Sequence, residues 1–142
     1  MATPMNETQW RAFLGEGTRT GKLATTRADG RPHVAPVWFL VDGDDLVLNT
    51  GADTVKGRTL ARDGRVAFCV DDDRAPYSFV LVEGRATLSE DLPQVKEWAT
   101  RIAARYVGAD LAAEYGARNG VPGELLVRVR IEKVVALADL AA

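Results

Sequence analysis

The sequence predicts a mainly β, α+β domain in which six or seven antiparallel strands are joined mostly by hairpins and flanked by helices. Short apolar runs are separated by turn signals, of which Asp29-Gly30 is the strongest. The run over 124–136 alternates apolar and charged residues with period two, so it predicts a strand with one buried and one wet face. Many short strands linked in this way favour a barrel or a sandwich.

The composition bounds the class of protein. The 142 residues suit a single domain over residues 1–142, and 46% hydrophobic with 27% charged residues is typical of a globular chain. A net charge of -2 without a basic block argues against nucleic acid and anionic membranes as partners. No run approaches the ~20 apolar residues of a membrane span, and the first residues lack the pattern of a signal peptide. With Cys69 as its only cysteine, we expect a cytoplasmic protein with a buried structural thiol.

The first half of the chain begins with a helix over 7–15, where Trp10, Phe13 and Leu14 form one apolar stripe. Strands are then expected over 21–27, 32–41 and 46–49. Pro36 interrupts the second of these. Because proline cannot donate to a strand ladder, it predicts a bulge or a sheet edge there.

The second half is expected to contain strands over 66–70 and 77–88, with a bend or bulge at Gly84. A helix over 92–106, capped by Ser89 or Asp91, buries a stripe at 3.6-residue spacing, and a short helix over 110–115 precedes the last strand. Three adjacent carboxylates in 71–76 raise a metal site as a hypothesis. The neighbouring sequence offers no matching ligand spacing, so we interpret this segment as a solvated loop.

The stretch 49–65 carries the clearest functional signal. Asp53 is the expected N-cap of a short helix. Hydroxyls and cations surround the helix start, and together with its free N–H groups they would form an anion site; they are Thr50, Thr54, Lys56 and Arg58. Gly57 costs the helix about 1 kcal/mol against alanine, which makes sense if something approaches the backbone closely. The alternative is a connecting helix with two solvated basic side chains.

Three segments in this order resemble the split β-barrels typified by pyridoxamine 5′-phosphate oxidase. They are 21–39 with its Asp-Gly turn and Pro36-Val-Trp-Phe39, 49–66 with Asn49-Thr50, Thr54 and Lys56-Gly-Arg-Thr-Leu60, and Val82-Glu-Gly-Arg-Ala86. The resemblance covers 18–88 well and the rest loosely. It implies an antiparallel split β-barrel that binds a flavin or a deazaflavin.

The resemblance also implies a set of cofactor-binding residues. Thr50, Thr54, Lys56, Gly57 and Arg58 would form the phosphate end of the site. The strand around Pro36, Val37 and Trp38 would contact the ring system. From the residues alone, His33 is either a structural or rim residue of its strand, or it lines the cofactor ring or donates a proton to the reduced substrate. The fold is usually a homodimer with cofactor sites at the interface, so Tyr77 from a second copy would close the pocket.

Two departures separate the chain from the vitamin B6 oxidase itself. Val55 occupies the position of an expected arginine, and the sequence ends at 137–142 without an arginine-rich tail. The chain resembles instead the actinobacterial reductases that use coenzyme F420. We therefore expect reduced F420 to give a hydride to an activated double bond of a small planar molecule. An FMN-dependent oxidase or reductase, and a non-catalytic carrier of flavin, deazaflavin or haem, remain alternatives.

No catalytic residue is assigned from the sequence. In such enzymes the cofactor performs the hydride step, and the protein supplies binding, orientation and exclusion of water. His33 is the only histidine, so no triad is evident; Tyr77, Tyr106 and Tyr115 are further candidate proton donors. Trp38 or Phe39 would line a pocket for a flat substrate, unless both belong to the barrel core.

Overall fold

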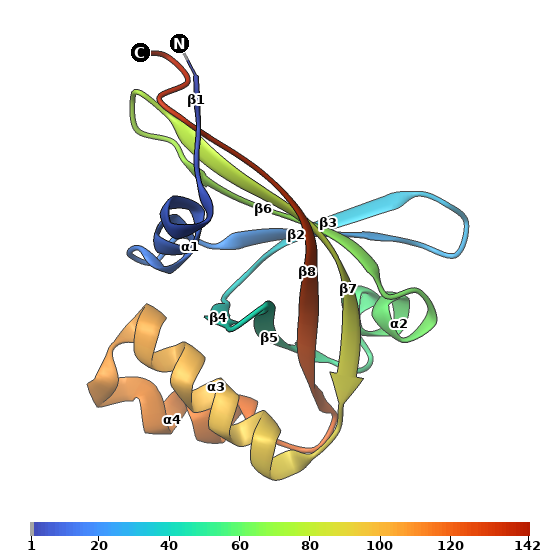
Figure 1. The fold of residues 1–142 in the computed structure, drawn as a ribbon. Helices are drawn as coiled ribbons and strands as arrows, with labels where there is room; N and C mark the ends of the chain where they lie inside the picture. The colour runs from blue at the N-terminus through green and yellow to red at the C-terminus, as the bar shows by residue number, and fades with distance from the viewer. Residues whose placement is uncertain (1) are drawn as a thin grey trace.

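The computed structural model describes residues 2–142 and places eight strands in one antiparallel sheet with four helices around it (Figure 1). The strand order is β3-β2-β6-β7-β8-β5-β4, with β1 paired to β8, so β3 and β4 end an open sheet. This confirms the predicted split-barrel class. The elements are β1 Thr3–Pro4, α1 Glu7–Gly15, β2 Gly21–Thr26, β3 Pro32–Val37, β4 Leu40–Asp42, β5 Asp45–Gly51, α2 Val55–Arg62, β6 Arg65–Asp72, β7 Ser78–Ser89, α3 Leu92–Val107, α4 Ala109–Asn119 and β8 Glu124–Ala138.

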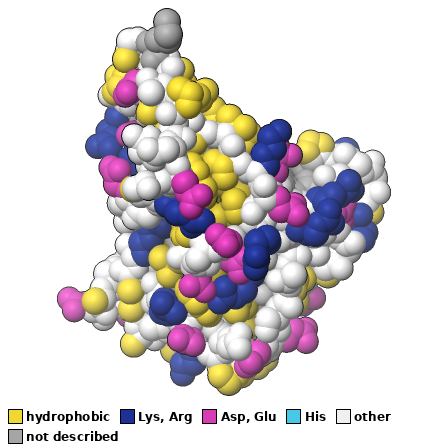
Figure 2. All heavy atoms as spheres, viewed as in Figure 1, with side chains coloured by type: hydrophobic (Ala, Val, Ile, Leu, Met, Phe, Trp, Pro, Cys, Tyr) yellow, Lys and Arg dark blue, Asp and Glu magenta, His cyan; other side chains and the backbone are white. Residues whose placement is uncertain are grey.

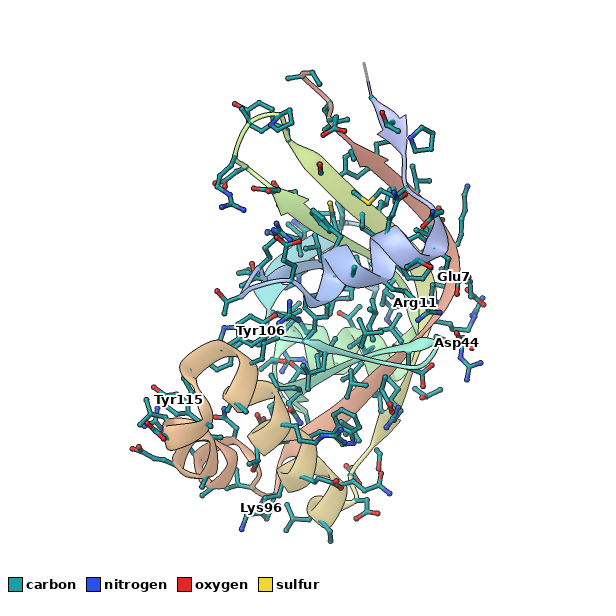
Figure 3. The ribbon with its side chains drawn as sticks, turned by 60° about the vertical axis from the view of Figure 1, so that its left-hand side comes forward. Glu7, Arg11, Asp44, Lys96, Tyr106 and Tyr115 are labelled. Atoms are coloured by element: carbon teal, nitrogen blue, oxygen red, sulfur yellow. The ribbon has the colours of Figure 1, made fainter. Side chains whose placement is uncertain are left out.

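The core lies between the inner face of the curved sheet and helix α1. Phe39 and Phe68 are fully buried and meet edge to face, with ring centroids 4.9 Å apart. The apolar stripe of α1 is buried as predicted and joins this cluster. Arg11 ties the outside of the same helix to the β4–β5 turn, because it pairs with both Glu7 and Asp44 (Figure 3).

One expected strand is divided in two. The run predicted over 32–41 forms β3 and β4, with Trp38 and Phe39 between them. Side chains of α3 replace the strand partners there: Arg105 donates to the Phe39 carbonyl at 2.8 Å, and the Phe39 N–H donates to Tyr106 Oη at 3.3 Å. Pro36 lies on edge strand β3 in unshifted register, so it marks an edge without a bulge.

Long-range pairing also extends several elements beyond their predicted limits. Strand β6 continues through Asp71 and Asp72, whose carboxylates pair with Lys22 and with Arg19 and Arg74. Cys69 on this strand is half-buried, and burial raises the pKa of its thiol. The predicted irregularity at Gly84 is confirmed by a register shift in the β7–β8 ladder.

The α3–α4 hairpin lies below the sheet in Figure 1 and forms a second layer over β5 and β8. Val95 and Trp98 of α3 pack there against Val47 and Leu126. Helix α4 is longer than the predicted segment 110–115. Asp91 is the N-cap residue of α3, but its side chain makes no cap bond; Ser89 Oγ accepts the Asp91 N–H instead.

Basic and acidic side chains alternate over the lower sheet on the face shown in Figure 2 and do not gather by sign. The ion pairs of β8 follow this pattern, since Arg128 contacts Asp42 and Asp45, and Arg130 contacts Asp45. No helix among residues 2–142 is long and apolar enough to cross a bilayer.

Candidate functional site

A cavity of about 420 Å³ lies where the ends of β3 and β5 meet the start of α2 and the α3–α4 hairpin. This volume is in the range of small-molecule sites, roughly 300–1,000 Å³. Its lining joins segments that are far apart in the sequence: Thr20, Pro36, Val37, Trp38, Asn49, Thr50, Gly51, Thr54, Lys56, Ala99, Ile102, Asn119 and Glu124. Six of the predicted cofactor-binding residues therefore line one cavity.

Thr54, and not Asp53, is the N-cap of α2. The Thr54 hydroxyl oxygen accepts the Gly57 N–H at 3.0 Å and donates to the Gly51 carbonyl at 2.7 Å. Asp53 is exposed, and its backbone carbonyl accepts from Arg58 Nη1 at 2.7 Å. The prediction for Asp53 is wrong because the turn Gly51–Thr54 places the threonine hydroxyl over the first helical N–H groups.

With Thr54 as the N-cap, one cation and two backbone N–H donors at the start of α2 remain available to bind an anion. Arg58 N makes the first backbone bond of α2, to the Thr54 carbonyl, so the Val55 and Lys56 N–H groups have no acceptor in the helix. Among residues 2–142, Lys56 makes no hydrogen bond or ion pair. Thr50 Oγ1 lies 3.3 Å from Thr54 Oγ1. Since Thr54 gives its proton to Gly51, Thr50 is the donor in that pair, and both hydroxyls hold the turn in shape.

Gly57 permits a close approach, but to another backbone segment. A Cβ on Gly57 would collide with the Gly51 carbonyl and would lie 3.0 Å from Ala52 Cα. Glycine at this position lets the first turn of α2 pack directly on the end of β5. Gly57 is buried and does not line the cavity, so its part in the site is to position Lys56.

Aromatic and aliphatic residues form another part of the lining. Trp38 stacks on Tyr106, with ring centroids 5.1 Å apart and planes within 2°, and lies 6.2 Å from the Tyr115 ring. Tyr106 and Tyr115 come from α3 and α4 (Figure 3). Ala99 and Ile102 continue this wall. Of the two aromatic candidates, Trp38 lines the cavity and Phe39 belongs to the core.

The Tyr106 hydroxyl is held by backbone groups. It donates to the Arg19 carbonyl at 2.8 Å and accepts from the Phe39 N–H, and burial raises the pKa of the phenol. Its role in the described chain is to hold the β3–β4 link, which positions Trp38.

Besides Gly57, three predicted site residues do not line the cavity of their own chain. His33 is opposite Thr25 in the β2–β3 ladder, and its Nδ1 is buried without a hydrogen-bond partner among residues 2–142. Arg58 borders a separate shallow hollow. Tyr77 is 44% exposed, lies immediately before β7 and has a positive φ of 65°.

The sequence did not identify Glu124 as a site residue, nor the cavity-lining residues of α3 and α4, which are Ala99, Ile102 and Asn119. Glu124 begins β8 and faces Gly51 across the β5–β8 ladder. Burial raises the pKa of its carboxyl, and the nearby Lys56 ammonium partly offsets this. No local pattern distinguishes Glu124, because only a pairing across more than seventy positions of sequence places it beside Lys56.

The comparison with family models agrees with this geometry. The model described as pyridoxamine 5′-phosphate oxidase matches residues 7–138, which includes every element that lines the cavity. The chain belongs to the pyridoxamine 5′-phosphate oxidase family. Its matched region contains both the Lys56 end and the Trp38 wall of the cavity.

The chain is also similar to several individual proteins. An F420H(2)-dependent biliverdin reductase from Mycobacterium tuberculosis (strain CDC 1551 / Oshkosh) is 32% identical over 133 residues, which cover 91% of this chain and 86% of that protein. The conserved hypothetical protein Rv2991 from Mycobacterium tuberculosis superposes with a TM-score of 0.81 at 26% identity, covering 93% of this chain and 84% of its own. A solved F420 reductase superposes with a TM-score of 0.69 at 27% identity, and the match covers 87% of this chain and 94% of that one.

Proposed function

We propose that this chain is an oxidoreductase that uses reduced coenzyme F420 to pass a hydride to an activated, conjugated double bond of a small planar organic molecule. The observation that carries the proposal is one cavity lined both by Trp38 and by Lys56, which lies at a helix N-terminus and has no partner among residues 2–142. The F420-dependent relatives support a redox enzyme with a flavin or deazaflavin cofactor.

The residues present fit a cofactor that carries a phosphate. Three donor groups lie at the positive end of α2. They are the side-chain ammonium of Lys56 and the backbone N–H groups of Val55 and Lys56, which have no acceptor in the helix. A bound deazaflavin would supply the hydride chemistry. The chain would bind the anionic group at Lys56, orient the ring system along Pro36, Val37 and Trp38, and exclude water with the α3–α4 hairpin.

Trp38 motivates the planar substrate. Its indole is held by the parallel stack on Tyr106, so the ring does not need to be ordered when a flat molecule binds beside it. Ala99 and Ile102 add apolar area beside it. A conjugated quinone, enone or lactone has the matching shape.

We further propose that the protein acts as a homodimer with the cofactor sites at the interface. The Tyr77–Phe79 segment of a second copy would close the pocket. The exposure of Tyr77 and its distance from the cavity of its own chain support an intermolecular role.

The decisive experiment is a titration of the purified protein with F420 and with FMN, followed by fluorescence, and then an acceptor assay. We expect F420 to bind more tightly than FMN, and reduced F420 to be consumed with at least one quinone, enone or lactone. Neither tight binding nor turnover with F420 would overturn the proposal. A yellow protein that turns over with FMN would establish the flavin alternative, and tight binding without reduction of any acceptor would indicate a carrier.

A further inference from the structure

Glu124 places a carboxylate on the turn that precedes α2. It pairs with Gly51 in the β5–β8 register. A Cβ built on Gly51 would have two nearest neighbours, Glu124 Oε2 at 3.0 Å and Thr54 Cγ2 at 3.1 Å. The acid therefore lies beside the N-cap of the helix, on the side of the cavity that offers Lys56 for an anion.

The charged groups around this carboxylate are few. Lys56 of α2 lines the same cavity, and Glu90, from the link between β7 and α3, borders an adjoining hollow with Glu124. Among residues 2–142, Glu124 and Lys56 line one cavity without forming an ion pair. One cation and one acid thus both face the ligand space. The charges of Lys56 and Glu124 offset each other, and the helix N-terminus adds a partial positive charge of about half a unit. The net charge of the site therefore suits a ligand group with one negative charge better than a group with two.

The negative charge of a phosphate group depends on how many of its oxygens are esterified. A phosphate monoester carries about −1.5 to −2 charges at neutral pH, because its second pKa is near 6. A phosphodiester has no second ionisable oxygen and carries one charge. FMN ends in a monoester, whereas the phosphate of F420 is esterified on both sides. The second charge of FMN would face the Glu124 carboxylate in a partly buried site, where charges interact more strongly than in water.

We propose that Glu124 determines cofactor specificity by making this site favour a singly charged phosphodiester over a doubly charged phosphate monoester. The inference rests on the proposed function, because it requires the cofactor phosphate to bind at the Lys56 end. It assigns the choice between two cofactors with similar ring systems to one side chain.

The test is isothermal titration of the wild-type protein and Glu124→Gln with FMN, riboflavin and F420. Glutamine keeps the size of the side chain and removes its charge. We expect FMN to bind about tenfold more tightly to the variant, which corresponds to ~1.4 kcal/mol. Riboflavin has no phosphate and should be unaffected, and the affinity for F420 should change much less than that for FMN. Glu90→Gln is the matched control, since it removes an acid outside the cavity and should leave all three affinities unchanged.

Several results would overturn the inference. An equal gain for FMN and F420 would mean that Glu124 repels anions in general, and an equal gain for riboflavin would mean that the substitution reshapes the cavity. Unchanged FMN affinity would also refute it, while F420 binding by the wild type would leave the proposed function standing. Failure of the wild type to bind F420 and FMN would remove both proposals. Thermal unfolding verifies that Glu124→Gln is folded, and Glu124→Ala should show the same shift in preference.

Discussion

The rings of Trp38 and Tyr106 stack in parallel, with centroids 5.1 Å apart and planes within 2°. Tyr106 also binds the Phe39 N–H through its hydroxyl, and its neighbour Arg105 binds the Phe39 carbonyl. The end of α3 therefore holds both the backbone of the β3–β4 link and the ring that lines the cavity. The shape of this cavity wall therefore depends on α3, because Trp38 lies in the link between β3 and β4 and on neither strand.

Tyr106→Phe should destabilise the protein by about 1–3 kcal/mol while it preserves the stack. The substitution removes the donor to the Arg19 carbonyl and the acceptor of the Phe39 N–H, which leaves half-buried groups unsatisfied. Urea unfolding measures the loss, and near-ultraviolet circular dichroism reports whether the environment of Trp38 is kept. Tyr115→Phe is the control. Its hydroxyl makes no hydrogen bond in the described chain, so we expect a change within about 0.5 kcal/mol.

Lys56→Ala should weaken cofactor binding by about 1–3 kcal/mol, the range for a hydrogen bond to a charged group. The fold should be retained, because the Lys56 ammonium has no partner among residues 2–142. The measurement is a fluorescence titration with F420 beside a thermal melt. Arg58→Ala removes the same charge two residues later, from a side chain directed to the Asp53 carbonyl and away from the cavity. It should retain most of the affinity, and equal losses in both variants would indicate a non-specific charge effect.

Local sequence signals predicted most of the fold. The stripe of Trp10, Phe13 and Leu14 predicts α1 from helical spacing, and the alternation along 124–136 predicts β8. Pro36 indicates a sheet edge because of its missing N–H. These features are determined by neighbours within a few residues, so a single sequence contains them.

The features that the sequence did not predict depend on contacts between residues that are distant in the sequence. The division between β3 and β4 follows from Arg105 and Tyr106 binding Phe39, more than sixty positions away. Glu124 enters the site only through its pairing with Gly51. The choice of Thr54 over Asp53 as N-cap depends on the backbone of the preceding turn, since both residue types cap helices well.

Gly57→Ala should destabilise the protein by about 1–3 kcal/mol, although alanine favours helices by about 1 kcal/mol over glycine. The new Cβ would collide with the Gly51 carbonyl and push α2 away from β5. Because this contact positions Lys56, the affinity for F420 should fall as well. Gly15→Ala is the matched control in α1, where a Cβ meets no atom within 4 Å. It should leave stability unchanged or raise it by up to ~1 kcal/mol, and a similar gain for Gly57→Ala would contradict the close packing.

Asp72→Asn should destabilise the protein near neutral pH and much less in acid. Arg74, and more weakly Arg19, lower the pKa of the Asp72 carboxyl from its ordinary value of 3.8 to about 2 in the folded protein. A lowered folded-state pKa contributes stability that is fully present above 3.8 and is lost as the pH falls towards about 2. The urea midpoints of the wild type and the variant should therefore differ most above pH ~4 and converge below it.

Comparing the wild type with Asp72→Asn separates the effect of the Asp72 carboxyl from the effects of the other carboxyls that titrate in acid. Asp73→Asn is the control, because Asp73 forms no ion pair in the described part of the chain. Its urea midpoint should follow the wild type at every pH. A constant gap between Asp72→Asn and the wild type from neutral pH to pH ~3 would show that Asp72 contributes hydrogen-bond geometry at the Arg74 turn and not charge.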